Sequence, residues 1–156
     1  MIISSDSFRY TIIILFFVTL FSSLKTSYAN EPEKIISYRK VLMKVTASHI
    51  SAIASISRSD ISYTSHVSTH ANAIAEIARI MPDTFPEGTF IGKTRAKEAI
   101  WSDWEKFLQM ASDLEQAATE LAEKSNSSLK VDLSAGLSAI GATCSNCHKL
   151  YRKPAR

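Results

Sequence analysis

Four stretches of the chain place apolar residues three and four positions apart, which is the spacing of an amphipathic helix. The helices that this pattern predicts span residues 33–57, 62–81, 95–124 and 132–151. Pro32 stands at the start of the first helix and Pro82 directly after the second, where proline opens or stops a helix. A polar turn at residues 125–128 separates the last two helices.

The last two helices carry the clearest apolar stripes, with spacings that alternate between four and three. In the third helix the stripe is Ile100, Trp104, Phe107, Ala111, Leu114, Ala118 and Leu121. In the fourth it is Leu133, Leu137, Ile140, Cys144, Cys147 and Tyr151. This alternation is typical of the seam between antiparallel helices. Four such helices with short connections predict an all-α fold, an antiparallel up-down-up-down four-helix bundle.

The first two helices have wider stripes, and a loop follows the second. On the first helix, two adjacent lines consist of Ile35, Leu42, His49 and Ile56 and of Ile36, Met43 and Ile50. On the second, the stripe is Val67, His70, Ile74, Ile77 and Met81. Residues 82–94 form a loop punctuated by proline and glycine, whose Phe85, Phe90 and Ile91 are expected to pack on the core.

The first 29 residues have the pattern of a secretory signal peptide. Arg9 precedes an apolar run at residues 11–21, and small residues at Ser27 and Ala29 fit cleavage after Ala29. The run has 11 residues, too few to cross a bilayer, which needs roughly 20. We therefore expect one domain, residues 30–156, exported to the periplasm without membrane attachment after cleavage. An uncleaved anchor is the alternative, because the segment before the run is only weakly basic.

The charge of the chain gives no strong preference for a polyanion. There are 18 Lys and Arg against 15 Asp and Glu, and removal of residues 1–29 takes away two basic residues and one acidic residue, leaving 16 against 14. No basic cluster has the form of a nucleic-acid footprint, so a nucleic-acid partner is not expected. Lys149, Arg152 and Lys153 form a modest basic group, which either steers an acidic partner or is ordinary solvated surface.

The most specific chemical signal is Cys144-Ser145-Asn146-Cys147-His148, the C-x-x-C-H pattern of covalent haem c attachment. The two thiols form thioethers with the vinyl groups of the porphyrin, and the adjacent imidazole ligates the iron. Residues three and four apart share a helix face, so one surface presents all three side chains. Since both cysteines belong to the predicted core stripe, we expect one covalently bound haem c between the helices, near the C-terminal helix.

Two other kinds of site use a C-x-x-C pair. A thioredoxin-type redox disulfide normally follows a strand, and the residues before Cys144 have no strand pattern. A structural zinc site needs four ligands, usually from two separated clusters, and His49, His66 and His70 form no second cluster of that type. The adjacent His148 favours haem over both alternatives.

The position of this motif near the C-terminus, on the fourth helix of a bundle, resembles the class II cytochromes c, which include cytochrome c′ and cytochrome c-556. Other segments that resemble this family are YRKVLMK at residues 38–44, Phe85-Pro86, KEAIWSDW at residues 97–104 and the ending CSNCHKLYR at residues 144–152. The resemblance covers essentially the whole domain after the signal peptide. The Arg-x-x-x-Met of the first helix and the CHxxYR ending indicate the class, whereas C-x-x-C-H alone indicates only haem c.

The resemblance implies roles for residues around the haem. Cys144 and Cys147 carry the thioethers, and His148 is the proximal ligand of the iron. Arg39 and Arg152 look like the residues that lie near the haem propionates, where a guanidinium fork suits a carboxylate.

Met43, which by the same resemblance faces the distal side of the iron, separates two functions. In the c-556 type a methionine here ligates the iron, which is then six-coordinate and low-spin. In the c′ type an apolar residue covers an open site that takes NO or CO, and some c′ proteins carry an unligated methionine. Ordinary core packing by Met43 is a further interpretation. We expect an electron carrier with iron held by His148 and Met43, and binding of NO or CO is the alternative.

The remaining expectations concern partners and other side chains. Redox partner proteins in the periplasm are expected, and the exposed parts of the first two helices allow a homodimer. His49 does not share a helix face with Met43, so a satisfied, partly buried histidine is expected. His66 and His70 have the i, i+4 spacing of a two-histidine metal clamp but no acidic partner. No catalytic triad, carboxylate pair or phosphate-binding loop is evident, so the chain is not expected to be an enzyme. A haem-free dithiol protein is a third hypothesis.

Overall fold

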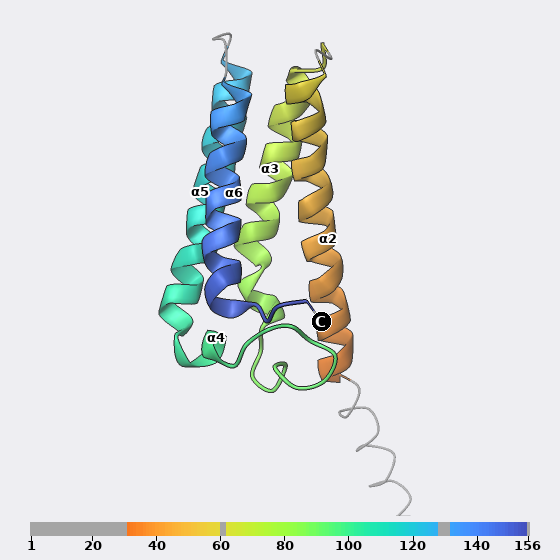
Figure 1. The fold of residues 1–156 in the computed structure, drawn as a ribbon, viewed down its shortest axis with the longest axis vertical. Coiled ribbons are helices and arrows are strands. Elements are labelled where there is room, and N and C mark those ends of the chain that lie inside the picture. Colours follow the sequence, from red (N-terminus) through yellow and green to blue (C-terminus); the bar gives the residue numbers. More distant parts are fainter. Residues whose placement is uncertain (1–30, 60–61, 128–131, 156) are drawn as a thin grey trace, which may run out of the picture.

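The computed structural model describes residues 31–59, 62–127 and 132–155. Its elements are α2 (Glu31–Arg58), α3 (Ser65–Ile80), the 3-10 turn η1 (Pro82–Thr84), α4 (Ala99–Ser102), α5 (Trp104–Asn126) and α6 (Leu133–Tyr151). The four long helices lie side by side, and each runs in the opposite direction to the one before it (Figure 1). The predicted all-α, antiparallel four-helix bundle is therefore confirmed.

The N-terminal predictions fall outside this structure. Residues 1–29 and the cleavage point after Ala29 are not among the described residues. Inside the described ranges, no helix combines the length and the apolar character needed to cross a bilayer.

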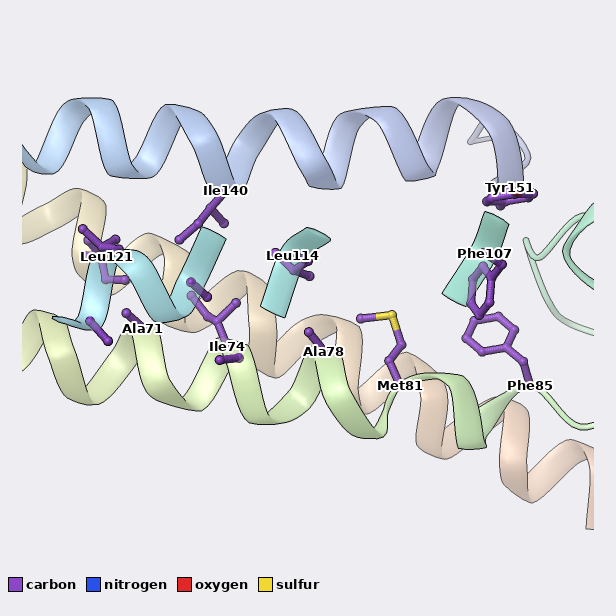
Figure 2. Close-up of a cluster of buried hydrophobic side chains, with 14 of the residues drawn as sticks. Ala71, Ile74, Ala78, Met81, Phe85, Phe107, Leu114, Leu121, Ile140 and Tyr151 are labelled. Atoms are coloured by element: carbon purple, nitrogen blue, oxygen red, sulfur yellow. The ribbon is translucent and has the colours of Figure 1, made fainter. Parts of the chain in front are cut away.

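Small side chains let α3 and α5 pack closely at the centre of the bundle. The buried alanines of this contact are Ala71, Ala75, Ala78, Ala118 and Ala122. Larger aliphatic side chains surround them, namely Ile53, Val67, Ile74, Leu114, Leu121 and Ile140, and Figure 2 shows several of these between α3, α5 and α6. Each fully buried aliphatic side chain of this size stabilises the fold by roughly 1.5–3 kcal/mol. This part of the bundle therefore fixes the helices that carry the functional site.

The buried face of α2 contains polar residues that the apolar pattern did not predict. Ile36, Leu42 and Ile53 are buried, and Arg39 and Thr46 share their face. Arginine and threonine side chains on a helix are ordinarily solvated, so the predicted apolar stripe did not include Arg39 or Thr46. Arg39 and Thr46 instead line the cavity described below.

The third predicted helix, residues 95–124, is wrong at its start. Ala96 forms an isolated antiparallel bridge with Arg152 in the C-terminal tail, so the segment before α4 is extended. The helix is interrupted again at Asp103, whose φ of −127° and ψ of 44° separate α4 from α5. Asp103 accepts a hydrogen bond from the Tyr151 hydroxyl at 2.7 Å. Contacts with the distant C-terminus thus override the local helical pattern.

The loop at residues 82–94 packs on the core only in part. Phe85 is buried and Phe90 is half-buried, as predicted, but Ile91 is 67% exposed, so the prediction for Ile91 is wrong. Gly88 has a φ of 80°, a backbone conformation that glycine adopts without steric cost. The loop turns there, so that Phe85 faces the bundle while Ile91 faces solvent.

Candidate haem site

A cavity of about 580 Å³ lies between α2, α5 and α6, beside the end of α6 that carries the C-x-x-C-H motif. Its apolar walls include Ile36, Ile50, Ile100, Phe107, Met110 and Leu114. The volume falls within the range of about 300–1,000 Å³ that is typical of sites for small organic ligands. Walls of this kind suit a large, mostly apolar group whose charged atoms reach the rim.

Cys144 and Cys147 form part of the α6 wall, and both are half-buried. Their thiols are not joined in a disulfide. Burial, followed by the proximity of Cys144, raises the pKa of the Cys147 thiol to about 11, and burial also raises the pKa of Cys144. A redox-active dithiol needs a lowered thiol pKa. This environment therefore counts against the thioredoxin-type interpretation.

The structure also counts against a structural zinc site at the cysteines. Such a site needs four ligands. Within the described residues, no group of three or more His, Cys, Asp and Glu side chains is placed to hold a metal ion. His49, His66 and His70 do not line the cavity, so they supply no second cluster to the cysteine pair.

His148 lies at the rim of the cavity, in the last turn of α6. Its Nδ1 is 3.5 Å from Nη1 of Arg152, which leaves Nε2 as the nitrogen available to a ligand. Partial burial, followed by the positive charges of Arg152 and Arg95, lowers the pKa of His148. Since neutral imidazole is the form that binds a metal, the surroundings of His148 favour ligation.

Both ends of α6 are fixed, and this positions the motif between them. At the start of the helix the Asp132 carboxylate accepts a hydrogen bond from the Ala135 N–H at 2.9 Å. At the other end the Lys97 N–H donates to the Tyr151 carbonyl at 2.9 Å. The buried Tyr151 ring lies with its centroid 5.6 Å from that of Phe107, as Figure 2 shows. The C-terminal anchor is the feature that the sequence pattern did not reveal.

Met43 lies midway along the α2 wall, which extends from Ile36 to Ile50. Its side chain is half-buried and packs against the core. Met81 and Met110 also line the cavity, and Figure 2 shows Met81 reaching from the end of α3 toward α5. The apolar pattern predicts Met81 only as part of a stripe, and it gives no signal for Met110, which lies beside the predicted seam rather than on it.

Arg39 is buried in the wall of the cavity, with only 5% of its surface exposed. Its Nε donates to the Thr84 carbonyl at 2.9 Å, and its Nη2 donates to the Thr89 hydroxyl at 2.6 Å. The guanidinium carbon lies 4.0 Å from the centroid of the Phe85 ring. Burial lowers the pKa of Arg39 to about 10. These partners are all neutral, so a ligand carboxylate at this wall would supply the missing negative charge.

The rim of the cavity is basic. Lys40, Lys44, Arg95 and Arg152 line it, and among the described residues no aspartate or glutamate does. Arg152 is exposed, whereas Arg39 is buried, so the two arginines face the cavity at different depths. The structure thus brings together all six residues predicted for the site: Arg39, Met43, Cys144, Cys147, His148 and Arg152.

These features fit haem c. Two thiols and an imidazole from one helix face an apolar cavity of suitable size, and a buried guanidinium and a basic rim suit a group that carries two carboxylates. The fold and the site together define a c-type haem protein built on a four-helix bundle.

Comparison with known proteins identifies the family. A family model described as Cytochrome C′ matches residues 34–152, and the chain belongs to the cytochrome c′ family. The predicted membership of the class II cytochromes c is therefore confirmed. Since this family binds haem c covalently, haem c is the cofactor of the chain, as predicted.

Relatives of both class II types match most of the chain. Cytochrome c′ from Rhodospirillum rubrum is 38% identical over 125 residues, which cover 80% of this chain and 85% of the relative. Cytochrome c-556 from Agrobacterium tumefaciens is 32% identical over 128 residues, covering 80% and 98%. The crystal structure of cytochrome c′ from Thermochromatium tepidum superposes with a TM-score of 0.72 at 28% identity, covering 80% of this chain and 98% of that one.

Replacing Arg39 by methionine is expected to lower the free energy of unfolding of the haem-loaded protein by about 2–3 kcal/mol. The variant loses hydrogen bonds from a charged donor to Thr84 and Thr89, and such bonds contribute about 1.5–3 kcal/mol. Urea denaturation followed by circular dichroism measures the change. Arg58→Met, at the exposed end of α2, is the matched control and is expected to change it by less than about 0.5 kcal/mol. Equal effects of the two substitutions would show that the hydrogen bonds of Arg39 do not stabilise the fold.

Proposed function

We propose that this protein is an exported monohaem cytochrome that carries electrons, with the iron held between His148 and Met43. The observation that carries the proposal is the position of Met43 at the middle of the α2 wall, while His148 comes from the α6 wall. Of the α2 side chains that line the cavity, Met43 alone carries a thioether. Histidine and methionine together are the ligand pair that raises the potential of c-type haem.

Covalent attachment is assigned to Cys144 and Cys147. Each thiol would hold the porphyrin through one thioether bond to a vinyl group. Two attachment points one helical turn apart fix both the position and the tilt of the group against α6. The anchors at the two ends of α6 then hold that position while the iron changes its charge.

The propionates are assigned to Arg39 and Arg152. Arg39 is held rigidly by Thr84, Thr89 and the ring of Phe85, so its remaining face presents a fixed positive charge. Arg152 is exposed and extends the positive charge to the rim. A guanidinium next to a carboxylate forms a charge-assisted pair, and burial of Arg39 strengthens that attraction.

The haem supplies one-electron oxidation and reduction when it is bound. With haem bound, the apolar walls would keep water from the iron, and His148 and Met43 would serve as its ligands in both oxidation states. Little rearrangement then accompanies electron transfer. The assignment includes no chemical turnover of a substrate, in agreement with a family known for electron carriers and ligand-binding proteins.

A second candidate function is the binding of NO or CO at an open sixth position that Met43 only covers. The relatives favour it: cytochrome c′ proteins from Rhodospirillum rubrum and Pararhodospirillum photometricum are 38% and 34% identical to the chain. The match to cytochrome c-556 at 32% identity favours the electron carrier instead. The two functions differ in one feature, which is whether the sulfur of Met43 is bonded to iron.

The proposal also covers where the protein acts and which proteins it meets. Residues 1–29 are assigned as a cleaved signal peptide and residues 30–156 as the periplasmic domain, where redox partner proteins meet the basic rim. An exposed apolar stripe on α2, formed by Tyr38, Val41 and Val45, suits a homodimer. A solved cytochrome c′ that is 26% identical, with a TM-score of 0.71, is described as showing ligand-controlled dimer dissociation.

Electron paramagnetic resonance of the oxidised, haem-loaded protein tests the proposal. Ligation by His148 and Met43 predicts a low-spin ferric signal, because two strong axial ligands split the iron d orbitals widely. A high-spin signal would contradict that ligation and make binding of diatomic gases the leading function. Reversible one-electron reduction in a potentiometric titration is expected in either case.

A further inference from the structure

Two histidines meet outside the haem cavity, where α2 packs on α3. His49 and His70 are both half-buried, and their Nδ1 atoms lie 2.9 Å apart. The ring centroids are 5.2 Å apart and the ring planes are inclined by 51°. Neither residue lines the haem cavity, so the pair is a separate feature of the bundle.

This contact requires the two rings to share one hydrogen. One Nδ1 donates its N–H and the other accepts with its lone pair, since two N–H groups or two lone pairs in direct contact would repel. The expectation that His49 is a satisfied, partly buried histidine is confirmed by this hydrogen bond. The same geometry places two basic nitrogen atoms from different helices, α2 and α3, next to each other.

We propose that His49 and His70 form a binding site for a divalent first-row transition-metal ion. In a tetrahedral site with metal–nitrogen distances of about 2.0–2.1 Å, two imidazole nitrogens lie roughly 3.3 Å apart. The pair observed at 2.9 Å must separate by only about 0.4 Å to reach that spacing. The donor ring moves its hydrogen from Nδ1 to Nε2, so both rings bind as neutral imidazoles and no proton is released.

The donor set indicates which ions the site takes. Imidazole nitrogen suits Zn²⁺, Ni²⁺ and Cu²⁺, and affinity for a given site rises from Ni²⁺ to Cu²⁺ and falls again at Zn²⁺. Among the described residues, no third His, Cys, Asp or Glu joins the pair to form a larger cluster. Water therefore completes the coordination shell, and the ion is exchangeable rather than structural.

His66 could in principle pair with His70 in a metal clamp formed by α3 alone. It lies one turn before His70 on α3, at the i, i+4 spacing of a surface clamp on a single helix. However, its exposed ring is stacked on Tyr63, with centroids 4.9 Å apart and planes within 5°. The direct contact is made by His49, so the proposed ligands come from two helices and His66 is not one of them.

Isothermal titration of the haem-loaded protein with Zn²⁺ tests the proposal. One ion per chain is expected. His49→Gln and His70→Gln are each expected to weaken binding at least about tenfold, since even groups behind the ligands affect affinity by 10–100-fold. His66→Gln is the matched control and is expected to keep the affinity within about twofold. The two-helix site would be overturned if His49→Gln left the Zn²⁺ affinity unchanged. It would also be overturned if only His66→Gln and His70→Gln lost Zn²⁺ binding.

A second measurement keeps the test valid if a variant folds poorly. The haem absorption spectrum and the circular dichroism of each variant without Zn²⁺ show whether the bundle is intact. X-ray absorption at the zinc edge of the unaltered protein, loaded with one equivalent, needs no variant at all. Two imidazoles per zinc ion are expected, and one or none would overturn the site. Neither the zinc titration nor the X-ray absorption at the zinc edge depends on how the haem iron is ligated.

Discussion

The variant in which Cys144 and Cys147 are both replaced by alanine is expected to carry no covalently bound haem. The two thiols are the chain's only cysteines, and both lie on the wall of the cavity. Without them no thioether forms, and haem can be held only by noncovalent contacts and by its iron ligands. Mass spectrometry of the denatured, exported protein checks this, because only a covalent adduct survives denaturation.

The loss of haem is also expected to destabilise the bundle. The cavity of about 580 Å³ would be left without the group that fills it, and lost burial of apolar surface costs about 25 cal/mol per Å². Ser145→Ala is the matched control, because Ser145 lies between the cysteines but is exposed. It is expected to keep full covalent loading. A covalent haem adduct in the double-alanine variant would refute the assignment of the attachment residues.

Replacing Met43 by leucine is expected to convert the iron from six-coordinate to five-coordinate. Leucine has a similar volume to methionine, so the packing cost is expected to stay below about 1.5 kcal/mol, while the thioether donor disappears. The reduction potential is expected to fall by on the order of 100 mV, within the roughly 0.8 V range that axial ligands cover. Absorption spectra and a potentiometric titration of the variant check both effects.

Met110→Leu makes the same chemical change elsewhere in the cavity wall. It is the matched control for Met43→Leu and is expected to leave the spectrum and the potential unchanged. If Met43→Leu also leaves both unchanged, the sulfur of Met43 is not an iron ligand. If Met110→Leu has the larger effect, the ligand comes from α5 rather than from α2.

The parts of the fold that the sequence predicted are those that depend on local periodicity. The stripe through Phe107, Leu114 and Leu121 is buried in the bundle as expected, because an antiparallel seam repeats every seven residues. The spacing of the two cysteines in the C-x-x-C-H motif likewise predicted that both thiols lie on one face of a helix. Cys144 and Cys147 are one turn apart and belong to the apolar stripe of the helix, so both were expected to face the core.

The parts that could not be predicted depend on contacts between distant residues. The break at Asp103 follows from its hydrogen bond with Tyr151, and the extended segment at Ala96 follows from its bridge to Arg152. The burial of Arg39 likewise depends on carbonyl groups of Thr84 and Thr89, far along the chain. No local pattern of apolar and polar residues contains that information.

The absorption spectrum of the purified, reduced, haem-loaded protein, recorded before and after addition of CO, tests the central claim most directly. Ligation of the iron by both His148 and Met43 predicts sharp low-spin bands that CO barely alters, because the sixth position is already filled. A high-spin spectrum that shifts at once on addition of CO would contradict that claim. Met43 would then only pack over an open site, and the protein would be a binder of diatomic gases.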